Sequence, residues 1–79
     1  MRRVGTVVRT AQGLAIARVD DDGRGHEPPD IGLMVVDESL STVGRVVDVF
    51  GPVERPYVAV TPTDGVALAT LMGGKLYAR

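Results

Sequence analysis

The side chains that could transfer protons or attack a substrate are few in this chain, and none stands in a recognisable relation to another. His26 is the only histidine among the 79 residues, and no cysteine is present. Acid–base and nucleophilic catalysis both need a second group that orients the reacting one, and neither His26 nor Asp64 has such a partner at a recognisable spacing. The absence of cysteine also excludes disulfides and thiolate metal sites. We therefore predict no catalytic residue and no enzymatic activity.

Metal and phosphate sites lack their signatures as well. The carboxylates at residues 20–22, and those of Asp37 and Glu38, supply the oxygen ligands that divalent cations accept, but their spacing is not that of a calcium-binding loop. Gly74 and Lys75 are not preceded by the glycines of a phosphate-binding loop. The sequence thus predicts no metal site and no cofactor.

Length and charge predict a small domain, and the absence of cysteine and of secretory or membrane-spanning segments favours the cytoplasm. A chain of 79 residues buries only about 60% of its surface on folding. The net charge of −1 argues against a strong nonspecific nucleic-acid binder, which would need a basic face. No apolar stretch approaches the roughly 20 residues of a transmembrane helix, and the basic start resembles no secretory signal. We expect a single domain over residues 1–79, located in the cytoplasm.

Ten glycines and five prolines divide the chain into short apolar segments. Their patterns predict six β-strands, at residues 4–10, 14–19, 33–36, 42–50, 57–61 and 75–78. In the second strand, alternation places Leu14 and Ile16 inward. A tight turn at residues 11–13, with Gly13 at positive φ, joins the first two strands, and residues 20–31 form a flexible acidic loop. Short strands separated by turns predict a small antiparallel barrel or sandwich, and a barrel removes exposed strand edges.

The segment between the last two strands, residues 64–72, allows two interpretations. Thr63 or Asp64 could cap one or two helical turns. Alternatively, an irregular loop packs Leu68 and Leu71 over the open end of a barrel. The glycines that flank the segment favour the loop.

The most informative segment is residues 43–60, in which two β-branched strands flank a proline-containing connection. Strict alternation places valines on both faces of the strand at residues 42–50. Two explanations remain open on the pattern alone. A β-bulge near Gly44 or Asp48 returns the apolar side chains to one core, or a partner covers the outer face of this strand.

The connection at residues 51–56 is stiff, because Pro52 and Pro56 fix their φ angles and withhold amide donors. A rigid loop loses little entropy on binding, and the aromatic residues on either side, Phe50 and Tyr57, offer large contact areas. We interpret this connection as a candidate binding loop. The alternative is an ordinary hairpin whose Phe50 fills the core.

These residues resemble a known family. The run Val43-Gly44-Arg45-Val46-Val47-Asp48-Val49-Phe50-Gly51-Pro52-Val53, followed by Pro56-Tyr57 and Val58-Ala59-Val60, is similar to the core of the glycine/arginine-rich-protein (GAR) family of box H/ACA ribonucleoproteins, in its short archaeal form. The resemblance extends over nearly the whole chain. It implies an all-β fold, a small six-stranded antiparallel β-barrel of the translation-factor (reductase/isomerase/elongation-factor) type.

The resemblance also implies a function. Members of this family are non-catalytic subunits of the RNA-guided pseudouridine synthase particle. They bind the catalytic domain of the dyskerin-type synthase and act on its substrate-RNA loop, which promotes substrate loading and product release in rRNA modification and ribosome biogenesis. Little direct RNA contact and a monomer in the absence of the partner are expected. The glycine/arginine-rich tails of the eukaryotic relatives are missing here, so no tail-mediated RNA binding is carried over.

Two hypotheses follow. In the first, the chain is a protein-binding accessory subunit. Its partner surface is formed or supported by Val47, Val49, Phe50, Gly51, Pro52, Val53, Pro56 and Tyr57. In the second, the chain is a PRC-type barrel adaptor that contacts ribosomal protein or RNA during ribosome maturation. Affinity for RNA without affinity for a pseudouridine synthase distinguishes the second from the first.

Overall fold

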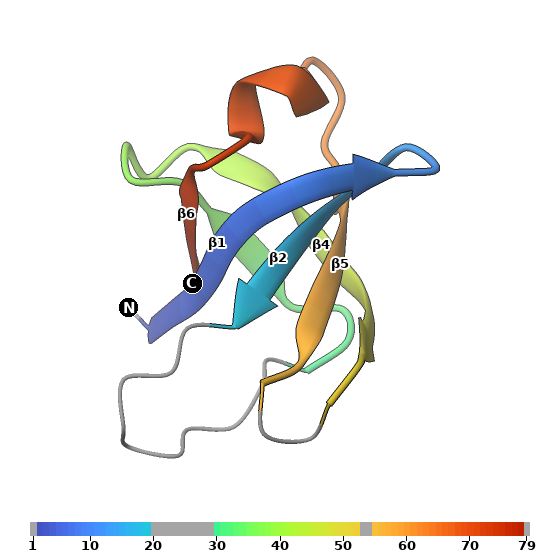
Figure 1. Ribbon diagram of the computed structural model, residues 1–79. Coiled ribbons are helices and arrows are strands. Elements are labelled where there is room, and N and C mark those ends of the chain that lie inside the picture. Colours follow the sequence, from blue (N-terminus) through green and yellow to red (C-terminus); the bar gives the residue numbers. More distant parts are fainter. Residues whose placement is uncertain (1, 20–29, 53–54, 79) are drawn as a thin grey trace.

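The fold is a closed barrel of six antiparallel strands (Figure 1). The computed structural model describes residues 2–19, 30–52 and 55–78. The strands are β1 (Arg2–Ala11), β2 (Leu14–Val19), β3 (Met34–Val36), β4 (Thr42–Phe50), β5 (Tyr57–Pro62) and β6 (Lys75–Ala78). Around the barrel they follow the order β1-β2-β5-β4-β3-β6. The predicted six-stranded antiparallel barrel is therefore confirmed, and the acidic loop predicted at residues 20–31 lies mostly outside the described residues.

The interior of the barrel is filled mainly by valine. The described core consists of Val4, Val7, Ala15, Ala17, Val19, Val35, Val43, Val46, Val58, Val60, Leu71, Leu76 and Ala78. None of the described residues is a buried polar or charged side chain. Branched side chains of this size suit a pleated, enclosed surface, and six strands leave little room for larger ones.

Between β5 and β6 the chain forms one turn of 3-10 helix, η1 (Leu68–Leu71), over one end of the barrel (Figure 1). Leu71 joins the core and Leu68 packs against it, as predicted for a segment that covers the open end. The preference for an irregular loop was wrong. The segment forms a 3-10 turn, and with three residues per turn this places the leucines at positions i and i+3 on the same side. The turn starts after Ala67 with no side-chain cap, so neither Thr63 nor Asp64 caps it.

The residues of β2 that face the interior are not the predicted ones. Ala15 and Ala17 belong to the core, whereas Ile16 is buried but lies outside the core cluster. Because alternate residues of a strand face opposite sides, Ile16 lies on the outer face. The crowded interior accepts alanine at these positions, and the larger side chain covers the sheet from outside.

Gly44 allows β4 and β5 to approach each other closely. A Cβ atom at this position would overlap the carbonyl oxygen of Thr61. Any larger residue at this position would force the two strands apart. No helix of the described residues is long and apolar enough to cross a membrane.

Candidate protein-binding surface

A β-bulge in β4 decides how the apolar residues of this strand are distributed. The pairing with β5 shifts by one residue between Val46, which is opposite Val60, and Asp48, which is opposite Ala59. Val47 is therefore the extra residue of the bulge. Val46 belongs to the core, and Val47 is 39% exposed.

A second bulge lies in β1. The pairing with β2 shifts between Val7, which is opposite Ala17, and Arg9, which is opposite Ile16. Val7 belongs to the core, and the extra residue, Val8, is 38% exposed. A separate register shift, in the pairing of β1 with β6, lies between Arg3 and Gly5 and interrupts the alternation before Val7, so that Val4 and Val7 both reach the interior.

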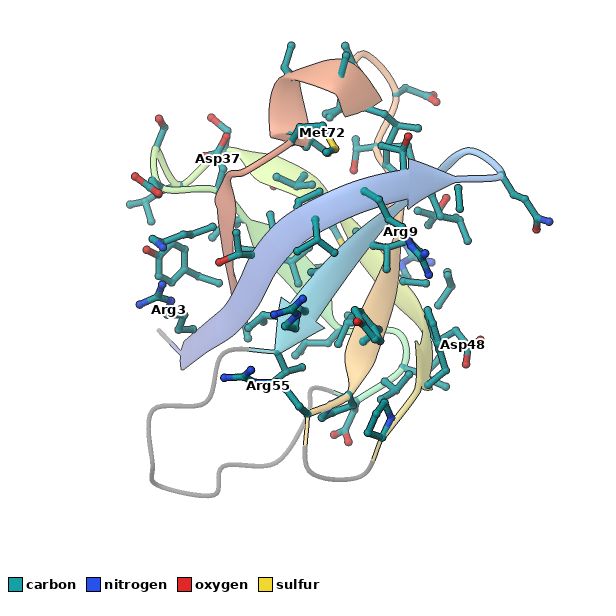
Figure 2. All side chains as sticks on the ribbon, in the orientation of Figure 1. Arg3, Arg9, Asp37, Asp48, Arg55 and Met72 are labelled. Atoms are coloured by element: carbon teal, nitrogen blue, oxygen red, sulfur yellow. The ribbon has the colours of Figure 1, made fainter. Side chains whose placement is uncertain are left out.

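The outward-facing residues of β1, β2, β5 and β4 form two rows across the sheet. One row runs Arg9, Ile16, Ala59, Asp48, and the next runs Thr6, Arg18, Tyr57, Phe50. We call these two rows, together with Val8 and Val47, the β1-β2-β5-β4 face. Figure 2 shows Arg9 and Asp48 at the side of the barrel that these strands form.

The centre of this face is apolar and already partly covered. Ile16 and Ala59 lie opposite each other, are only 4% and 3% exposed, and do not belong to the interior cluster. The guanidinium carbon of Arg9 lies 5.9 Å from the centroid of the Tyr57 ring. Since β2 lies between β1 and β5, the Arg9 side chain crosses β2 beside Ile16, with its aliphatic part over apolar surface.

Phe50 and Tyr57 form a stacked aromatic pair at the ends of β4 and β5. Their ring centroids are 5.7 Å apart and the rings are inclined by 22°, a geometry typical of offset stacking. Phe50 is 37% exposed and Tyr57 is half-buried. The alternative in which Phe50 fills the interior core is therefore wrong.

The connection after β4 supports the aromatic pair. Gly51 has a φ of 93°, and a Cβ atom there would lie 2.9 Å from Cδ2 of Tyr57. The amide of Arg55 donates to the carbonyl of Pro52 (3.2 Å). Pro56 is buried, and its carbonyl accepts a hydrogen bond from the amide of Val19 (3.0 Å). This fixes the end of the loop against β2.

The predicted partner-binding residues do not all lie on one surface. Val47, Phe50, Gly51 and Pro52 are exposed, and Tyr57 is half-buried beside Phe50. Two others lie behind: Val49 packs against the core, and Pro56 is buried. Val53 lies outside the described residues. Their role in binding stays a prediction.

Sequence reasoning missed the part of the face that β1 and β2 contribute. Arg9, Ile16 and Arg18 were not predicted, because the surplus of apolar residues that indicated a binding face lies within residues 43–60. A signal was available in the doublet Val7-Val8, which matches Val46-Val47 in β4. Two adjacent valines face opposite sides of a regular strand, so each doublet places one apolar side chain outside.

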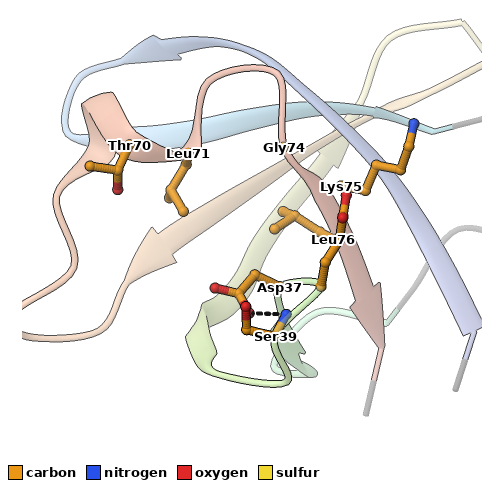
Figure 3. A pocket seen from close by; sticks show the side chains of 8 residues that line it. Asp37, Ser39, Thr70, Leu71, Gly74, Lys75 and Leu76 are labelled. Carbon is orange, nitrogen blue, oxygen red and sulfur yellow. Dashed lines mark hydrogen bonds between the residues drawn. The ribbon is translucent and has the colours of Figure 1, made fainter.

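A separate hollow of about 350 Å³ lies between the β3–β4 turn and the segment joining η1 to β6 (Figure 3). Asp37 and Lys75 are among its lining residues. The carboxylate of Asp37 accepts hydrogen bonds from the amides of Ser39 (2.8 Å) and Ser41 (3.0 Å), so it organises its own turn. In the part of the chain that the structure describes, no three His, Cys, Asp or Glu side chains gather as metal ligands.

Fold and surface together define a class: a small closed β-barrel that presents an apolar, arginine-flanked sheet face. Comparison with known families agrees with this class. Residues 1–79 match the family described as the Gar1/Naf1 RNA binding region. The chain belongs to this family of H/ACA ribonucleoprotein proteins, whose barrel is an accessory domain rather than a catalytic one.

Two similar proteins illustrate the match. A protein of Methanocaldococcus jannaschii described as uncharacterized is 36% identical over 56 residues, which cover 71% of this chain and 60% of that protein. The chain thus spans about 60% of the length of this curated relative. Among solved structures, the Gar1 domain of Naf1 superposes with a TM-score of 0.70 over 99% of this chain and 81% of that one, at 14% identity. At this identity the likeness supports the fold alone.

Proposed function

We propose that the protein is a non-catalytic accessory subunit of the box H/ACA RNA-guided pseudouridine synthase particle. It binds the catalytic domain of the dyskerin-type synthase through the β1-β2-β5-β4 face. By acting on the substrate-RNA loop of the synthase, it promotes substrate loading and product release. Family membership supports the particle, and the exposed apolar face supports a protein partner.

The observation that carries this proposal is the outward position of Val47 and Phe50. The bulge at Val47 leaves two large apolar side chains of β4 outside the core, 39% and 37% exposed. A 79-residue chain has little apolar surface to spare. Apolar residues gathered on one rigid face, with an aromatic pair among them, are typical of a protein interface.

The binding test uses the double variant Val47→Asp, Phe50→Asp and the purified synthase catalytic subunit. Two carboxylates in the middle of the interface would remain without partners, so we expect the affinity to fall by at least roughly 30-fold, the loss of about 2 kcal/mol typical of a hot spot. The matched control is Leu40→Asp, Met72→Asp, which places the same charges at two other exposed apolar positions. Wild-type affinity in the first variant would contradict the site assignment, provided both variants retain the far-UV circular dichroism of the wild type.

The same variants test the effect on catalysis. Product release limits multiple-turnover rates and leaves single-turnover rates unaffected. We therefore expect the wild-type chain to stimulate multiple-turnover pseudouridine formation by the reconstituted particle more strongly than single-turnover formation. The Val47→Asp, Phe50→Asp variant should lose this stimulation, and the control should keep it.

A further inference from the structure

The β1-β2-β5-β4 face carries more positive charge than the protein as a whole. Arg9 and Arg18 lie in its two rows, and Arg45, opposite Thr61, lies on the same side of β4 two residues before Val47. Arg18 and Arg45 are exposed. One carboxylate, that of Asp48, faces them on these strands, whereas the whole chain has a net charge of −1.

The remaining described carboxylates lie elsewhere. Asp30 precedes β3, Asp37 and Glu38 belong to the β3–β4 turn, and Asp64 follows β5. Asp48 also uses one carboxylate oxygen to accept a hydrogen bond from the amide of Val49 (2.8 Å). Within the described ranges, no carboxylate forms an ion pair with Arg18 or Arg45. The arginines therefore surround an apolar centre, and the described carboxylates do not neutralise Arg18 and Arg45.

From this distribution we propose that the protein surface which docks here is apolar at its centre and acidic at its edges, with carboxylates that face Arg9, Arg18 and Arg45. The inference rests on the proposed function, since it describes the partner of the same face. Charges at the edge of an interface steer the encounter and fix the orientation, and the apolar centre supplies the lasting contact.

The width of the first row gives the approximate width of the partner surface that fits this face. Arg9 and Asp48 are the two ends of one row across four strands. Neighbouring strands lie about 4.8 Å apart, so the row spans roughly 14 Å. Ile16 and Ala59 at the centre are only 4% and 3% exposed, so an apolar patch on the partner would contact mainly the exposed side chains of Val8, Val47 and Phe50. Acidic side chains are needed opposite the three arginines and not opposite Asp48. The asymmetry gives the partner one preferred orientation.

A single-stranded RNA fits this face less well than a protein does. RNA-binding sheets offer an open aromatic ring on which a base stacks. Tyr57 is approached by Phe50 from β4 and by Arg9 from the opposite side of β5. Both flanks of the ring are therefore occupied.

The test measures association kinetics of the purified chain with the synthase catalytic subunit over a range of salt concentrations. Arg18→Glu reverses one charge at the edge of the face, and the double variant Ser39→Glu, Ser41→Glu, in the β3–β4 turn, changes the net charge by the same amount outside the face. We expect Arg18→Glu to lower the association rate constant by roughly tenfold at low salt and to flatten its salt dependence, because edge charges act mainly on encounter. The Ser39→Glu, Ser41→Glu variant should change neither quantity.

The outcomes separate the inference from the proposed function. If the association rate constant changed neither with Arg18→Glu nor with salt concentration, the proposal of an acidic partner surface would be wrong. The accessory-subunit role would remain intact. Failure of the wild-type chain to bind the synthase at all would instead contradict the role itself. If Arg18→Glu abolished binding to guide RNA and left synthase binding unchanged, the face would be a nucleic-acid contact and the inference would be wrong.

Discussion

Gly51 holds the aromatic pair in place through a backbone conformation that other residues rarely adopt. Its φ of 93° turns the chain away from β4, and the missing side chain leaves room for the ring of Tyr57. The sequence suggested a stiff loop because of its prolines. In the structure, a glycine beside them also determines where the ring lies.

Replacement of this glycine should therefore affect both stability and binding. Gly51→Ala introduces backbone strain of about 1–2 kcal/mol and pushes Cβ against the Tyr57 ring. The matched control is Gly65→Ala, which has a φ of 89° but no atom within 4 Å of the added Cβ. Urea denaturation should show similar strain in both variants and an additional loss in Gly51→Ala. Synthase binding should weaken only in Gly51→Ala, and equal binding by the two variants would contradict a positioning role for Gly51.

At the scale of elements, the hairpin of β1 and β2 shows how local sequence sets the register. Ala11 pairs with Leu14, so that only Gln12 and Gly13 form the turn, with φ values of 52° and 78°. Positive φ at both central residues defines a type I′ turn, whose twist suits a hairpin. Glycine was predicted at positive φ, whereas Gln12 adopts it against its own preference.

Gln12→Asn should consequently stabilise the protein. Asparagine tolerates the left-handed region better than glutamine does, and Asn-Gly is the preferred type I′ sequence. We expect an increase of about 0.5 kcal/mol in the free energy of unfolding, in line with other local backbone effects. Gln12→Ala serves as the control, since it shortens the same exposed side chain without this preference. A variant Gln12→Asn that is no more stable than Gln12→Ala would show that the turn conformation is not limiting.

The positions of the strands could be predicted from the sequence, but the direction in which several side chains face could not. Strands of β-branched residues bounded by glycine and proline were recognisable. Three strands have the predicted bounds, and the other three differ from the prediction by at most two residues at either end. Face assignment assumes unbroken alternation, and the bulges at Val8 and Val47 break it. Whether a bulge forms depends on the neighbouring strand, which is distant in sequence. The prediction that Ile16 faces inward is wrong for a related reason: the narrow interior is filled by Ala15 and Ala17 on this strand, and Ile16 faces outward.

At the scale of the whole molecule, the two explanations for the apolar residues of β4 are compatible: the strand has a bulge, and it also has an exposed apolar face. The pattern of β4 left open either a bulge that serves one core or an outer face that a partner covers. The structure has a bulge that sends Val46 inward and leaves Val47 outside. The closed barrel therefore satisfies its interior and still presents apolar residues to solvent. A fold that needed all of its valines for stability would have none on the outer face.

This separation of stabilising from exposed valines can be measured on one doublet. Val46 is fully buried, so Val46→Ala should lower the free energy of unfolding by about 2 kcal/mol, through lost burial and the cavity it leaves. Val47→Ala removes the same atoms one residue later and should cost less than about 0.5 kcal/mol, as is usual for surface positions. Affinity for the synthase should show the opposite order, with the larger loss in Val47→Ala once both proteins are fully folded. Chemical denaturation gives the first quantity and calorimetric titration the second. If Val47→Ala destabilised the chain as much as Val46→Ala, the outer valine would belong to the fold, and its exposure would be no argument for a partner.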